Sequence, residues 1–73
     1  MEDRMENIKI HTEFIKLNQL LKLANAAQSG GTVNHMITEG LVKVNGETEK
    51  RKGKKIYPGD LVEVEAIGSF LVG

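Results

Sequence analysis

Ser29-Gly-Gly-Thr-Val-Asn-His-Met-Ile-Thr-Glu-Gly40 continues directly into Leu41-Val-Lys-Val-Asn-Gly46, and these two segments decide the fold. The first predicts a helix over residues 30–39. Ser29 suits the N-cap position because its hydroxyl can accept a hydrogen bond from an unpaired amide of the first turn. Gly40 suits the position after the helix because glycine adopts the left-handed conformation without steric cost. The apolar residues recur at the spacing of one buried helix face, and they are Val33, Met36 and Ile37.

The second segment predicts a β-hairpin. Val42 and Val44 alternate with Lys43, which is typical of a half-buried strand, and Asn45-Gly46 is typical of a type I′ turn. Residues 57–60 read Tyr-Pro-Gly-Asp and match a type II turn, with proline second and glycine third. We expect the remaining strands of a small sheet at residues 47–49, 61–65 and 69–72.

The N-terminal part predicts one more helix and an edge strand. Leucines and alanines recur at helical spacing over residues 18–27, and Asn18 suits the N-cap position. The alternation in Ile8-Lys9-Ile10-His11 predicts a short strand that adds to the sheet edge. Residues 1–7 are polar, and we expect a disordered tail there. One domain is therefore expected over residues 8–73.

The composition excludes several classes of protein. The 73 residues include no Cys, which excludes a disulfide framework and cysteine-based zinc sites. No apolar run approaches the roughly 20 residues that span a bilayer, and we expect a cytoplasmic monomer. Lys and Arg balance Asp and Glu at ten each, but residues 43–55 hold six cations against two glutamates. Such a positive patch attracts polyanions although the net charge of the chain is zero.

Several short motifs resemble those of a known family. In chain order they are Lys16-Leu17-Asn18 with Leu21, Ser29, Met36-Ile37 with Gly40, Val42 with Val44-Asn45-Gly46, and Gly59-Asp60. This arrangement resembles the ribosomal-protein S-four-like RNA-binding domain, the αL motif, and is most similar to its small stand-alone bacterial members. The resemblance implies an α+β fold in which two short antiparallel helices pack on a small, mostly antiparallel sheet. It also implies binding to structured RNA, commonly ribosomal or transfer RNA, through the second helix and the adjoining loop and hairpin.

The chain departs from this family at the start of the second helix. Typical members carry an arginine directly after the serine, where this chain has Gly30, and basic residues further on, where it has Asn34 and His35. We therefore expect the main RNA contact in residues 50–55, where lysines neutralise phosphates and the planar guanidinium of Arg51 binds a phosphate bidentately. Backbone amides at the glycine-rich helix start can also approach a phosphate. The candidate RNA-binding residues are Lys43, Lys50, Arg51, Lys52, Lys54, Lys55, Gly30, Gly31 and His35.

Other interpretations stay open. The cationic run could be an ordinary solvated loop, or it could dock an acidic protein if the chain is a protein-interaction adaptor. The two glycines could serve only a tight connection between helices. An enzyme fragment is the weakest hypothesis, because no residues predict a catalytic or cofactor site.

Neither metal binding nor stacking of single-stranded nucleic acid is predicted. His11 and His35 are far apart in the chain, with no carboxylate cluster beside them. Tyr57, Phe14 and Phe70 are the only aromatic residues, which are too few for a platform that stacks successive bases. Tyr57 could stack on a base, but it precedes a turn proline, and we expect it to pack locally.

Overall fold

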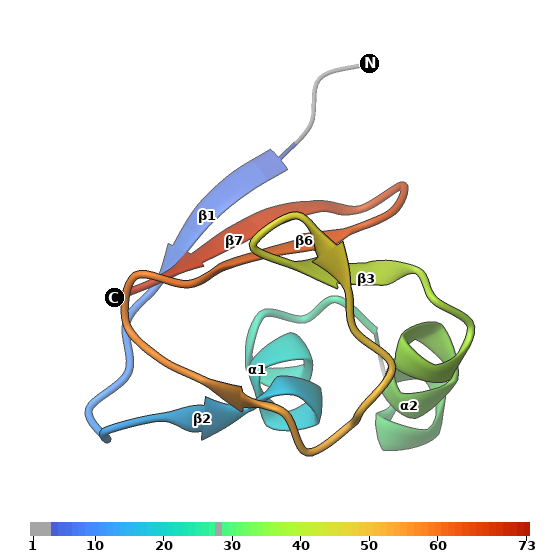
Figure 1. The fold of residues 1–73 in the computed structure, drawn as a ribbon, viewed down its shortest axis with the longest axis horizontal. Coiled ribbons are helices and arrows are strands. Elements are labelled where there is room, and N and C mark those ends of the chain that lie inside the picture. The colour runs from blue at the N-terminus through green and yellow to red at the C-terminus, as the bar shows by residue number, and fades with distance from the viewer. Residues whose placement is uncertain (1–3, 28) are drawn as a thin grey trace.

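The computed structural model describes residues 4–27 and 29–73 and has two layers (Figure 1). One layer is a five-stranded sheet, and the other contains the two helices, which cover one face of that sheet. The expected α+β fold, with two helices on a mostly antiparallel sheet, is confirmed. In chain order the elements are β1 (Arg4–Ile8), β2 (Ile15–Lys16), α1 (Leu17–Leu23), α2 (Gly30–Thr38), β3 (Val42–Val44), β4 (Glu47–Thr48), β5 (Lys55–Ile56), β6 (Leu61–Val64) and β7 (Gly68–Val72).

The strands of the large sheet follow the order β1-β7-β6-β3-β4. β1 runs parallel to β7, and the other neighbouring strands are antiparallel. β2 and β5 form a separate two-stranded antiparallel sheet. In Figure 1 this small sheet lies beside α1, on the helical side of the large sheet.

The hydrophobic core lies between the two layers. Both helices and the inner face of the large sheet contribute to it, together with one residue of β5. Its largest fully buried side chains are Phe70, Leu17, Leu20, Leu21, Ile37, Ile56, Val33, Val42, Val62 and Val72. The expected buried face of α2 is confirmed. The outer face of the sheet is not covered by a helix, and strand register places Lys43, Glu63 and Ser69 in one row across it.

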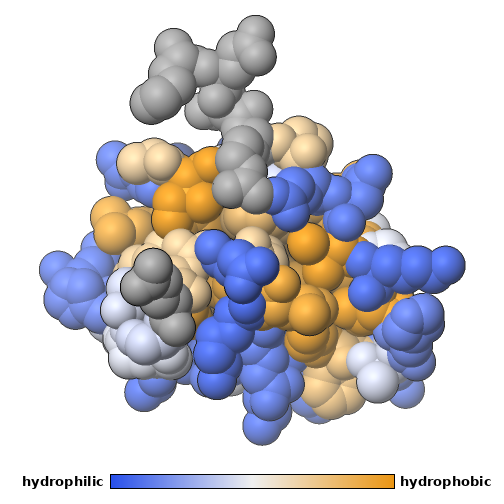
Figure 2. Space-filling view, turned by 180° about the vertical axis from the view of Figure 1, so that it is seen from behind, coloured by the Kyte–Doolittle hydropathy of each residue, from blue (hydrophilic) through white to orange (hydrophobic). Residues whose placement is uncertain are grey.

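Apolar surface remains between hydrophilic side chains on the side of the molecule that Figure 2 shows. In the described part of the chain, the large apolar side chains that stay exposed are Met5, Leu23, Tyr57 and Leu71. Neither of the two helices in the described ranges is long and apolar enough to cross a membrane.

α2 and the hairpin after it follow their local sequence signals. The Ser29 hydroxyl accepts a hydrogen bond from the Thr32 amide at 3.2 Å, which confirms the N-cap. Gly40 has a φ of +79°, the left-handed conformation expected after the helix. Asn45 and Gly46 have φ values of +52° and +87°, as a type I′ turn requires.

α1 is shorter than expected and ends at Leu23 instead of residue 27. Asn25 has a φ of +57°, and its amide donates to the Lys22 carbonyl at 3.1 Å. The Ala26 amide donates to the Leu21 carbonyl at 2.9 Å. These two bonds form a Schellman helix end, for which asparagine is the commonest substitute for glycine. The predicted end was wrong because Ala24 and Ala27 continue the helical spacing of apolar residues past the point where the helix stops.

The start of α1 is not capped by Asn18, so that expectation is also wrong. The N-cap is Lys16, whose side chain makes no capping hydrogen bond. Instead, the amide of Leu17 donates to the Lys54 carbonyl at 2.9 Å, and the amide of Asn18 donates to the Lys52 carbonyl at 3.1 Å. A distant loop therefore satisfies the first amides of the helix, which a helix must pair with something outside itself.

β1 begins earlier than the expected edge strand at residues 8–10. It pairs in parallel with β7 from Arg4 to Ile8. The prediction of a disordered tail over residues 1–7 is therefore wrong for residues 4–7, and residues 1–3 lie outside the described part. The position at the sheet edge is confirmed. Residues 4–7 are mostly polar and show no strand pattern of their own. They form a strand because β7, at the other end of the chain, pairs with them.

Candidate nucleic-acid interface

The cationic loop, which we define as residues 50–55, has a fixed course along the start of α1. Its carbonyls at Lys52 and Lys54 accept the first amides of that helix, at 3.1 and 2.9 Å. Within the loop, the Lys54 amide donates to the Arg51 carbonyl at 3.3 Å. Lys55 belongs to β5 and pairs with Lys16 of β2. The backbone hydrogen bonds thus hold the loop, while its side chains project from it.

The lysines of the cationic loop carry accessible positive charge. Lys50, Lys52 and Lys55 are exposed, and Lys54 is half-buried. In the described ranges none of these four lysines forms an ion pair. The Lys55 ammonium lies 4.9 Å from the centre of the Phe14 ring, a distance suited to a cation–π contact. Like charges this close repel each other, so a polyanion that binds here relieves that repulsion.

Arg51 differs from the lysines because its guanidinium already has a partner. Its Nε donates to Glu49 Oε2 at 2.9 Å, and its Nη2 donates to Oε1 at 3.1 Å. The Arg51 backbone amide also donates to Oε2 at 3.0 Å. These bonds, the side-chain ones foremost, lower the pKa of Glu49 from 4.5 to about 2, and the same contact raises the pKa of Arg51. A phosphate that binds the Arg51 guanidinium through two hydrogen bonds therefore has to compete with the Glu49 carboxylate.

The Glu49–Arg51 contact should make stability depend on pH in acid. The pKa of Glu49 is lower in the folded protein than its ordinary value of 4.5. The ionised carboxylate therefore contributes its full share to the free energy of unfolding above pH 4.5, and this contribution is lost as the pH falls toward about 2. We expect Glu49→Gln to be slightly less stable than the parent near neutral pH, because the Arg51 side chain is 73% exposed and solvent screens the ion pair. Urea unfolding over a pH series should show this difference shrinking as the pH falls from 4.5 to about 2. A difference that stays constant over that range would contradict this assignment.

The start of α2 forms a second group of candidate contacts, at the end of the helix opposite Gly40. Gly30 and Gly31 open the helix, and the Lys22 ammonium lies 3.5 Å from the position that a Cβ at Gly30 would take. The Lys50 Cε lies 3.5 Å from the corresponding position at Gly40, beyond the other end of α2. A helix of nine residues is about 13 Å long, so the Lys50 side chain beside Gly40 and the Lys22 ammonium beside Gly30 are separated by about that distance.

Lys22 was missed by the sequence analysis. A signal was present, because Lys22 lies in the last turn before a short connection, and such a connection places the end of one helix beside the start of the next. Its ammonium supplies positive charge beside Gly30, at the position where other members of the resembled family have an arginine.

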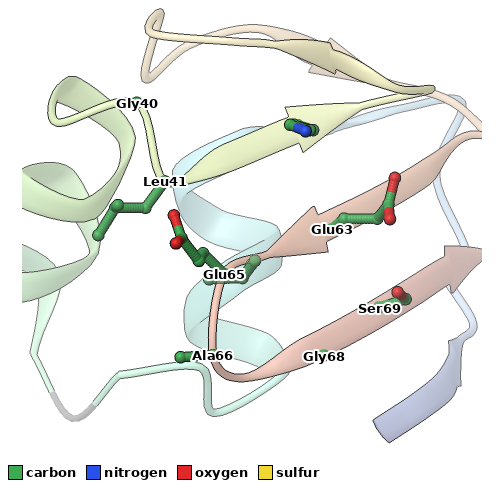
Figure 3. A pocket seen from close by; sticks show the side chains of 9 residues that line it. Gly40, Leu41, Glu63, Glu65, Ala66, Gly68 and Ser69 are labelled. Atoms are coloured by element: carbon green, nitrogen blue, oxygen red, sulfur yellow. The ribbon is translucent and has the colours of Figure 1, made fainter. Parts of the chain in front are cut away.

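Lys43 belongs to β3 and not to the cationic loop. It lies on the outer face of the sheet, directly across from Glu63 in β6 and Thr48 in β4. Beside it is an open hollow of about 400 Å³ that also includes Glu63 and Glu65 among its lining residues. Figure 3 shows Glu63 and Ser69 projecting from the sheet on the side away from α1. The two glutamates make this hollow a poor place for a phosphate.

His35 lies on the exposed surface of α2. Its backbone carbonyl accepts hydrogen bonds from the Glu39 amide and the Thr38 hydroxyl, at 2.9 and 3.1 Å. Across the described part of the chain, no three His, Asp or Glu side chains come together in a way that could hold a metal ion.

The sequence pattern of the S4 domain matches residues 8–72, which is most of the chain. This chain belongs to the S4-domain family. Two curated relatives of the S4-domain chain support the match. One, from Bacillus subtilis (strain 168), is named "Probable ribosome maturation protein RlbA" and is 51% identical over 65 residues, covering 89% of this chain and 92% of the relative. The other, from Escherichia coli (strain K12), is named "Putative RNA-binding protein YbcJ" and is 44% identical over 48 residues, covering 66% of this chain and 69% of the relative. Neither name describes a catalytic activity, in agreement with the expectation that this chain is not an enzyme.

In this S4 domain, two separated motif residues meet in space. The Asn45 side chain donates to Asp60 Oδ1 at 3.1 Å and accepts the Leu61 amide at 2.9 Å. The other oxygen of Asp60, Oδ2, accepts the Tyr57 amide at 2.8 Å. Hydrogen bonds from the Asn45 side chain therefore join the Asn45-Gly46 turn of the hairpin to the turn that ends at Asp60. This contact fixes the end of the segment that carries the cationic loop.

Proposed function

We propose that this S4-domain protein binds structured ribosomal RNA in the cytoplasm and acts in ribosome maturation. The observation that carries the proposal is the cationic loop, whose lysines form no ion pair with the described residues and whose backbone is held against the start of α1. A preformed loop binds with little loss of backbone entropy, which favours affinity. The names of the Bacillus subtilis and Escherichia coli relatives, one for ribosome maturation and one for RNA binding, support the same function.

The proposed contacts form two groups on one RNA. Lys50, Lys52, Lys54 and Lys55 would neutralise phosphates, and Arg51 would join them when a phosphate displaces Glu49. The amides of Gly30 and Gly31, with the Lys22 ammonium, would approach another phosphate, about 13 Å from the one that Lys50 meets. His35 would touch the RNA between these groups, on the exposed surface of α2. Lys43 remains a candidate on charge alone, although its neighbourhood is acidic.

Phosphate contacts of this kind position a protein without reading bases. We therefore expect binding that depends on the shape of the RNA, because folded RNA is recognised mostly through its backbone and 2′-hydroxyl geometry.

The salt dependence of binding to a ribosomal RNA fragment tests the proposal. Each neutralised phosphate releases counterions, so four to six contacts should give a log–log slope of about −3 to −5. Polyglutamate serves as the matched control, because it offers negative charge without phosphate or ribose. Equal affinity for polyglutamate and for the RNA would instead support an adaptor that docks an acidic protein.

A further inference from the structure

A surface hollow next to the cationic loop is lined by cations, by an aromatic ring and, in one part, by the carboxylates of Glu47, Glu49 and Asp60. Two adjoining hollows, of about 400 and 510 Å³, share four lining residues. We call them together the Tyr57 hollow, after those shared residues, which are Arg51, Lys54, Lys55 and Tyr57. These volumes are in the range of pockets that accommodate a small organic molecule.

Tyr57 is held in place although its side chain is 43% exposed. It follows Ile56, which is fully buried, and precedes Pro58, whose ring restricts the backbone. Its amide donates to Asp60 Oδ2 at 2.8 Å, and its carbonyl accepts the Asp60 amide at 3.0 Å. Tyr57 thus packs locally, as expected, but it also remains partly exposed to solvent on a turn that hydrogen bonds hold in place.

A second aromatic ring supports the first. The centres of the Phe14 and Tyr57 rings are 5.9 Å apart, with a tilt of 48° between their planes. The Lys55 ammonium is placed over Phe14, 4.9 Å from its centre. Ring and charge are therefore both positioned before any ligand binds, which lowers the entropic cost of binding.

We propose that the Tyr57 hollow binds one unpaired nucleotide of the RNA. The base stacks on the Tyr57 ring, and the adjoining phosphate meets Lys54, Lys55 and the outer N–H groups of Arg51 in the 510 Å³ part, whose described lining holds no carboxylate. This inference rests on the proposed function, since it names a feature that the bound RNA must have. A single ring is no platform for a run of bases, but it suffices for one base displaced from a helix, and RNA-binding proteins commonly recognise such bases by stacking them on aromatic rings.

The test compares two RNA hairpins that differ only in one bulged nucleotide, 2-aminopurine, whose fluorescence falls when it stacks. The parent protein should bind the bulged hairpin more tightly and quench its fluorescence. Tyr57→Ala should weaken binding to the bulged hairpin by about 5- to 150-fold, the range that loss of one stacked base allows. It should leave the paired hairpin within about 2-fold, because the lysines that meet phosphates are unchanged. Tyr57→Phe keeps the ring and should bind both RNAs as the parent does.

Two results would overturn the inference while leaving the proposed function intact. One is a parent that binds both hairpins equally and does not quench the bulged base. The other is Tyr57→Ala weakening both hairpins to the same degree while it unfolds like the parent. A parent that binds neither hairpin at any salt concentration would refute the proposed function, and the inference with it.

Discussion

Leu21→Ala should lower the free energy of unfolding by about 2–4 kcal/mol, because it leaves a cavity between α1 and the sheet. Leu21 is 0% exposed and belongs to the core. A chain of 73 residues has a total stability of only about 4–11 kcal/mol. The variant should therefore melt far below the parent protein, and thermal and urea unfolding followed by circular dichroism would measure both.

Leu23→Ala is the matched control, since it makes the same change in the same helix. Leu23 is 56% exposed, and its truncation should change the free energy of unfolding by less than about 1 kcal/mol. Similar losses in the two variants would mean that the buried face of α1 is assigned incorrectly.

The four lysines of the cationic loop should account for most of the salt dependence of RNA binding. Changing Lys50, Lys52, Lys54 and Lys55 together to Gln should flatten the log–log salt slope by about 3 to 4 units, at about 0.9 per phosphate contact. The affinity should fall by about 1–4 kcal/mol, since each exposed charge contact contributes little alone. That loss corresponds to about 5- to 1,000-fold in Kd. Salt titrations of the parent and the variant on one ribosomal RNA fragment measure both quantities.

Lys9→Gln controls for the loss of charge itself. Lys9 is exposed and lies in the segment between β1 and β2, outside the cationic loop. Its replacement should leave the salt slope unchanged, whereas Lys52→Gln alone should flatten the slope by about one unit. Equal changes in these two single variants would show that the RNA senses overall charge and that the cationic loop has no special part in binding.

The parts of the fold that follow local signals could be predicted from the sequence. The Ser29 cap, the left-handed Gly40 and the Asn45-Gly46 turn depend on neighbouring residues, and all three are found in the structure. The start of α1 depends on carbonyls at Lys52 and Lys54, far along the chain. Periodicity contains no information about such a contact.

The same distinction applies to β1 and to the candidate interface. β1 forms because the other end of the chain offers it a partner. The density of lysines in residues 50–55 is visible in the sequence, and so is their exposure. The pairing of Arg51 with Glu49 depends on how the loop bends. The position of the Lys22 ammonium beside Gly30 depends on how the helices pack.

Crosslinking in cells, followed by sequencing of the attached RNA, tests the central claim most directly. The account predicts that the parent protein recovers ribosomal RNA fragments, and that the crosslinked peptides include residues 50–57. The variant with all four loop lysines changed to Gln should recover far less of the same RNA at equal protein abundance. Recovery of the same ribosomal RNA fragments at unchanged yield by that variant would contradict the account.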